Sequence, residues 1–155
     1  MILVNGGDWG AVSVGGKDLS IDFGAGTASL NQLTVSESTL ALSGGIFSGE
    51  GAGIDCSDSS LTLEGVSFEG SGTRSAALRA DNSTVSGSRV SVRDWSSTDG
   101  SPFEFSESTV ELRDMVFADT SGRRGGAIYA RGGSLSLSNV SVADTRAEEG
   151  GGALY

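Results

Sequence analysis

Three aspartates recur at a fixed interval in the C-terminal half of the chain. Asp94, Asp119 and Asp144 are 25 residues apart, and each follows an apolar residue by two positions. If this interval is one coil of a stack, the carboxylates lie about 4.8 Å apart and repel one another. Calcium, which prefers several oxygen ligands, would offset the repulsion. Two interpretations therefore stay open: a weak calcium site, or three aspartates that each cap their own turn, which is the more ordinary role of Asp.

A second row combines charged and aromatic side chains at nearly the same spacing. Its members are separated by 24 to 26 residues and are Asp55, Arg79, Glu104, Tyr129 and Tyr155. On adjacent coils an exposed Arg79–Glu104 pair contributes less than about 1 kcal/mol. The two tyrosines, with Arg131 nearby, could stack on a sugar ring or anchor a protein, because Tyr and Arg supply much of the binding energy at interfaces. We predict a binding surface formed by Arg79, Glu104, Tyr129, Arg131 and Tyr155.

The composition excludes several classes of protein. The 25 glycines, the many Ser and Thr residues and the single proline argue against a helical or α/β domain. Apolar residues come in short bursts, with no run near the ~20 residues of a membrane-spanning helix. A net charge of -10 disfavours nucleic acid as a partner. With no His and a single Cys, Cys56, catalysis would depend on carboxylates and Arg.

An internal repeat supplies the elements that position these rows. The chain divides into segments 19–39, 40–60, 61–84, 85–109 and 110–134 and a partial copy from 135 to 155. Each segment opens with an apolar alternation, such as Leu61-Thr-Leu63-Glu-Gly-Val66-Ser-Phe68, and period two is typical of a strand. A Gly/Ser/Asp-rich loop of variable length then precedes a second alternation, such as Ile54-Asp-Cys56. Because the loop absorbs the length differences, the pattern is that of a solenoid.

The predicted fold is all-β: a right-handed parallel β-helix of about seven coils of 21–25 residues. A single coil cannot bury its apolar face, whereas stacked coils share one interior, and parallel crossover connections are almost always right-handed. One predicted inward ladder is Leu40, Leu61, Val85, Val110 and Leu135, and the other is Ile54, Leu78, Phe103, Ile128 and Leu154. Trp9 and Trp95 fall in loops, where they either fill gaps or bind a ligand.

One segment resembles a known repeat. Phe117-Ala-Asp-Thr-Ser-Gly-Arg-Arg-Gly-Gly-Ala-Ile-Tyr-Ala130 resembles the repeat of the chlamydial polymorphic outer-membrane protein family, in which an F-x-x-N motif precedes G-G-A-[ILV]. Gly151-Gly-Ala-Leu-Tyr155 resembles the start of a second copy, and Thr120 stands where the family has Asn. The resemblance implies an autotransported surface β-helix that acts as an adhesin.

These observations favour a non-catalytic surface or secreted scaffold that mediates adhesion by binding a host-cell protein or a glycan. The alternative is a polysaccharide-active β-helix enzyme of the lyase or glycosidase type, whose full active site is not contained in this chain. We expect residues 1–155 to form a single β-helix domain within a longer passenger or surface protein. Flanking coils or a capping domain would cover its ends, and regions beyond this chain would hold it at the outer membrane of a bacterium.

Overall fold

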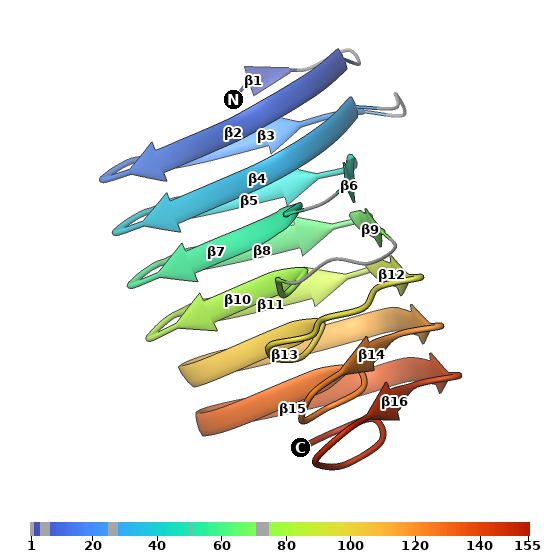
Figure 1. The fold of residues 1–155 in the computed structure, drawn as a ribbon. Coiled ribbons are helices and arrows are strands. Elements are labelled where there is room, and N and C mark those ends of the chain that lie inside the picture. The colour runs from blue at the N-terminus through green and yellow to red at the C-terminus, as the bar shows by residue number, and fades with distance from the viewer. Residues whose placement is uncertain (1, 4–6, 25–27, 50, 71–74) are drawn as a thin grey trace.

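The short apolar alternations of the sequence form parallel β-strands in the computed structural model, which describes residues 2–3, 7–24, 28–49, 51–70 and 75–155. The strands wind into a solenoid with three walls (Figure 1). The first wall contains β2 (Gly7–Gly15), β4 (Ala28–Ser36), β7 (Gly53–Ser57), β10 (Leu78–Asp81) and the beginnings of β13 (Phe103–Ala118) and β15 (Ile128–Ala143). All of these strands are paired in parallel, as predicted.

The other two walls follow in each coil. The second wall contains β1 (Ile2–Leu3), β3 (Asp18–Asp22), β5 (Thr39–Ser43), β8 (Ser60–Glu64), β11 (Thr84–Ser88) and the middle of β13 and β15. The third wall contains the beginnings of β2 and β4, then β6 (Ile46–Ser48), β9 (Ser67–Glu69), β12 (Ser91–Arg93) and the ends of β13 and β15. A separate two-stranded sheet pairs β14 (Ser121–Gly122) with β16 (Arg146–Ala147).

The winding is right-handed, as predicted. In Figure 1, β2, β4, β7 and β10 cross the near side from right to left, the second wall returns on the far side, and successive coils descend towards the C-terminus. The structure contains about five turns, so the prediction of about seven is too high. The prediction counted partial coils as whole ones, whereas the rungs at both ends are incomplete in the described part of the chain, β1 being two residues long.

One predicted strand is divided by a turn. The alternation from Leu61 to Phe68 forms β8 and β9, because Gly65 adopts a left-handed φ of 63° and turns the chain into the third wall. Arg89, Asp114 and Asn139 occupy the same turn in later coils with φ of 52°, 52° and 51°. Two of these residues are linked across coils at the surface, since the Asn139 amide donates a hydrogen bond to the Asp114 carboxylate.

Both predicted inward ladders line the core. Leu40, Leu61, Val85 and Val110 are paired in register and buried, and the same holds for Ile54, Leu78, Phe103 and Ile128. The last members differ, because Leu135 is partly buried and Leu154 is 48% exposed, and no coil in the described part of the chain packs over them. Burial of the inward-facing Cys56 raises the pKa of its thiol.

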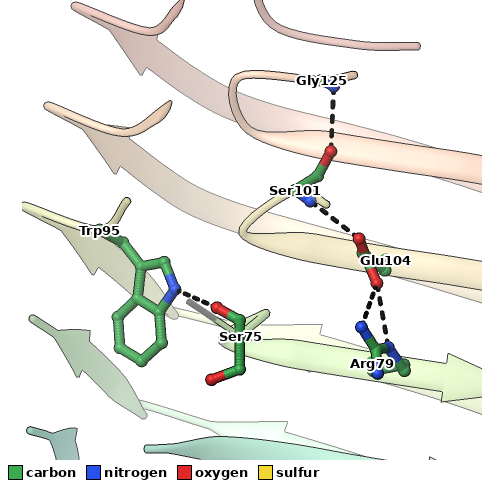
Figure 2. A network of polar contacts seen from close by, with 6 residues as sticks. All are labelled: Ser75, Arg79, Trp95, Ser101, Glu104 and Gly125. Carbon is green, nitrogen blue, oxygen red and sulfur yellow. Dashed lines mark hydrogen bonds and ion pairs between the residues drawn. The ribbon is translucent and has the colours of Figure 1, made fainter. Parts of the chain in front are cut away.

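Aromatic side chains fill the middle of the stack. The Phe103 ring centroid lies 5.6 Å from that of Phe68 and 5.1 Å from that of Phe117. Trp95 is fully buried, and its indole N–H donates a 3.1 Å hydrogen bond to the Ser75 carbonyl (Figure 2). Trp95 therefore fills a gap, one of its two predicted roles. Trp9 is half-buried, with its ring edge-to-face against Phe23 at 6.3 Å.

A ladder of buried serines, which the sequence analysis missed, lines the turn between the first and second walls. Each hydroxyl donates to the carbonyl two residues earlier at 2.6–2.7 Å. The hydroxyls of Ser59, Ser83 and Ser108 also each accept a hydrogen bond from the backbone N–H of the serine one coil earlier, at 3.0–3.1 Å. Because backbone groups inside a protein need partners, the hydroxyls stabilise the turn of every coil. The members of this serine ladder are Ser38, Ser59, Ser83 and Ser108.

We expect Ser83→Ala to lower the free energy of unfolding by about 1 to 2 kcal/mol, because it leaves the buried Ser59 N–H without its acceptor. Ser97→Ala is the matched control. Ser97 is 3% exposed, and its hydroxyl has no hydrogen-bond partner among the described residues, so its loss should change stability by less than about 0.5 kcal/mol. Urea unfolding measures both variants. Equal effects would show that the serine ladder is not stabilising.

Candidate functional site

Strand register brings the predicted mixed row together on the outer face of the first wall. Arg79 is paired with Asp55 on one side and with Glu104 on the other, and Glu104 is paired with Tyr129. A bridge between Ile128 and Leu154 places Tyr155 on the next rung. The inward neighbours are buried, so alternation turns the row outwards, and the predicted register is confirmed.

Arg79 and Glu104 form the centre of a polar network (Figure 2). Two guanidinium nitrogens of Arg79 contact Glu104 Oε2, at 3.0 Å from Nε and 2.9 Å from the terminal nitrogen. Glu104 Oε1 accepts the Ser101 N–H at 2.8 Å, and the Glu104 side chain is 17% exposed. Both carboxylate oxygens are therefore already hydrogen-bonded within the protein.

The network continues into the next coil. The buried Ser101 hydroxyl accepts the Gly125 N–H at 3.0 Å (Figure 2). Gly100 permits the close approach of the carboxylate, because a Cβ at this position would lie 1.5 Å from Glu104 Oε1. Backbone and side-chain groups from three successive coils thus hold Arg79 and Glu104 in place, and the pair forms a preorganised part of the surface.

The tyrosines pack on each other and on an arginine that the sequence analysis did not include. The Tyr129 and Tyr155 rings stack with centroids 5.7 Å apart and planes inclined by 16°. The Arg124 guanidinium carbon lies over the Tyr129 ring, 5.5 Å from its centroid, and Arg124 donates a 3.3 Å hydrogen bond to the Tyr129 hydroxyl. Tyr129 is half-buried and Tyr155 is 61% exposed. Arg124 directly precedes the Gly-Gly-Ala segment, and this adjacency is the one sequence signal for its position.

A shallow depression of about 400 Å³ lies along this face. Its outward-pointing lining comes from three adjacent coils and consists of Arg79, Asp81, Glu104, Ser106, Arg124, Tyr129 and Arg131. A hollow of about 130 Å³ adjoins it and shares Glu104, Arg124 and Tyr129. The predicted binding residue Arg131 therefore belongs to the site, whereas Tyr155 lines neither hollow and instead supports Tyr129.

The three predicted aspartates occupy equivalent turns. Asp94, Asp119 and Asp144 have φ of 52°, 53° and 52°, and the N–H groups of Asp94 and Asp119 donate to the carbonyl of the next coil. Asp readily adopts this left-handed conformation, which agrees with the turn interpretation. Within the described ranges, no three or more His, Cys, Asp or Glu side chains gather where they could hold a metal ion. The calcium site stays a prediction that this geometry does not favour.

The two Gly-Gly-Ala segments lie in loops that pack on each other next to the site. Thr120, at the place of the family's Asn, is buried and donates a 2.6 Å hydrogen bond to the Gly126 carbonyl. The following coil packs directly on this loop: a Cβ at Gly126 would lie 2.0 Å from the Gly152 carbonyl oxygen. The ion pair between Arg123 and Glu149, at 2.9 Å, joins the two loops at the surface. Together these contacts position Arg124 beside Tyr129.

The fold and its outward rows define a parallel β-helix with a polar and aromatic depression on one wall. No protein-family model, curated protein or solved structure matches the chain. Among the residues that the structure describes, no helix has the length and apolar character needed to cross a membrane.

Proposed function

We propose that this chain is a non-catalytic β-helix scaffold that binds a partner through the depression around Tyr129. The observation that carries the proposal is the combination of Arg79, Arg124 and Arg131 with a half-buried Tyr129 in one depression. Arg and Tyr are the residue types that dominate binding energy at interfaces. The rigid parallel walls hold these side chains at fixed spacing, so little conformational entropy is lost when a partner binds.

The arrangement of Glu104 supports binding over catalysis. A general base or acid needs an oxygen that can reach the substrate proton. Here Arg79 occupies one oxygen of Glu104 and the Ser101 N–H occupies the other. The pairing therefore favours a structural role for Arg79 and Glu104 in the floor of the depression. The polysaccharide-cleaving enzyme is accordingly the weaker of the two proposals.

The resemblance of the segment from Phe117 to Ala130 to the chlamydial polymorphic outer-membrane protein repeat supports a place at the bacterial cell surface. In this proposal the chain is part of an autotransported or secreted adhesin, and its partner is a host-cell protein or glycan. Regions outside this chain would provide export and anchoring. The acidic net charge of -10 argues against nucleic acid as the partner.

Attachment of the fluorescently labelled protein to cultured epithelial cells tests the proposal. We expect saturable binding that Tyr129→Ala reduces about tenfold or more, since truncation of an aromatic anchor at an interface commonly costs at least ~1.4 kcal/mol. Tyr129→Phe, which keeps the ring, should retain most of the binding. The same preparation incubated with pectic, alginate-like and neutral glycans should release no new reducing or unsaturated ends. Turnover that depends on Arg79 or Glu104 would replace this proposal with the enzyme.

A further inference from the structure

Two arginines of the depression have no carboxylate partner among the described residues, although the chain as a whole is acidic. Arg124 and Arg131 form no ion pair with any residue that the structure describes, whereas Arg79 is paired with Glu104. Arg124 contacts the ring and the hydroxyl of Tyr129, and both contacts leave its positive charge uncompensated. Because unpaired guanidinium groups bind planar oxyanions through parallel N–H donors, this part of the surface is suited to a carboxylate.

We infer that the depression binds an acidic saccharide, with a uronate carboxylate placed between Arg124 and Arg131. This inference rests on the proposed function and specifies its ligand. The other lining groups match the hydroxyls of a sugar: the Ser106 and Tyr129 hydroxyls can donate or accept, and the Asp81 carboxylate accepts. The ligand therefore meets two arginines without an ion-pair partner together with hydroxyl and acceptor groups in the same depression.

A saccharide fits this surface better than an acidic peptide does. A peptide would bind most readily by adding a strand to a free sheet edge or by inserting apolar side chains into a groove. The depression offers neither on β10 and β13, because both strands are already paired on two sides in the first wall, and the start of β15 is paired with β13 and bridged to Leu154. The apolar residues of the wall, among them Ala80 and Phe105, point into the core and are buried. The remaining mode of binding is hydrogen bonding across a shallow polar surface, which suits the many hydroxyl groups of a saccharide.

Isothermal titration calorimetry with the folded chain tests the inference. The probes are a galacturonic acid trimer, the same trimer as its methyl ester, and an uncharged galactose trimer. We expect binding of the acid form, at least a tenfold weaker affinity for the ester, and further weakening of acid binding when the salt concentration is raised. Arg131→Gln and Arg124→Gln should each reduce the affinity for the acid form about 10- to 100-fold. Arg89→Gln, at an exposed arginine on another turn, is the matched control and should bind as the parent does.

Several outcomes would overturn the inference. Equal affinity for the acid and its ester would show that no carboxylate is recognised. Equal binding of a glutamate-containing peptide of the same charge would show an anion site without saccharide selectivity. If none of the saccharides binds while cell attachment still depends on Tyr129, the ligand class is wrong and the proposed function stands. Circular dichroism and melting curves of each variant separate a binding defect from unfolding.

Discussion

Replacing Phe103 with Ala should lower the free energy of unfolding by about 3 to 5 kcal/mol, the largest loss that we expect from one side chain. Phe103 is fully buried in the fifth rung of the first wall, at the start of β13, and contacts aromatic rings from three directions. Its ring centroid lies 5.6 Å from Phe68, 6.0 Å from Phe105 and 5.1 Å from Phe117. Truncation leaves a cavity among these three rings. Because β13 is paired with a strand on each side, the backbone cannot easily move in to fill the cavity.

Guanidinium unfolding followed by tryptophan fluorescence measures this loss, because Trp95 is buried beside Phe68 at 6.2 Å. Val142→Ala is a suitable control, since Val142 is 37% exposed and its loss should cost less than about 1 kcal/mol. Phe103→Leu should cost less than half as much as Phe103→Ala. A Phe103→Ala protein as stable as the control would show that the aromatic cluster does not hold the stack together.

Gly126→Ala should destabilise the protein by about 2 kcal/mol or more, although it adds one methyl group. The added Cβ would lie 2.0 Å from the Gly152 carbonyl oxygen and 2.8 Å from the Arg146 amide nitrogen. Both obstacles are backbone atoms of the following coil, so relief requires the two coils to separate. The same movement would strain the hydrogen bond from Thr120 to the Gly126 carbonyl.

The chain contains its own control for this substitution. Gly152 occupies the same position of the second Gly-Gly-Ala segment, and a Cβ there would meet nothing within 4 Å. Gly152→Ala should therefore change the melting temperature little, while Gly126→Ala lowers it by several degrees. Equal shifts would mean that the glycine is needed for its backbone conformation and not for the stacking of one coil on another.

The sequence spacing was sufficient to predict the strand register. Inward residues recur every 21 to 25 positions, and within each strand the outward residues alternate with the inward ones. Arg79, Glu104 and Tyr129 consequently lie where the spacing places them. The serine ladder was missed since its hydroxyls serve the backbone of a neighbouring coil, and composition does not distinguish such a serine from an exposed one. The turn at Gly65 was missed although the apolar alternation shifts there, from the odd positions Leu61 and Leu63 to the even positions Val66 and Phe68.

The composition of the depression was harder to predict than its strands. Arg124 lies in a loop, and its place over Tyr129 depends on how that loop folds against Gly125 and the following coil. The stacking of the Tyr155 ring on Tyr129, outside both hollows, was not predicted, and the role of Tyr155 in binding stays a prediction. Periodicity fixes which face of a strand a residue occupies, whereas contacts between loops depend on close packing that short sequence patterns do not encode.

Strand β1 and the C-terminal residues lie at opposite ends of the stack (Figure 1), which has a mechanical consequence. A pulling force applied between them acts along the axis, so it loads the hydrogen bonds of one coil at a time and not all of them in parallel. Each detached coil of 21 to 25 residues would lengthen the chain by about 70 to 90 Å, given ~3.3–3.6 Å per extended residue. The solenoid would therefore extend under tension in nearly equal steps. While one coil detaches, the remaining coils would keep their stacked contacts.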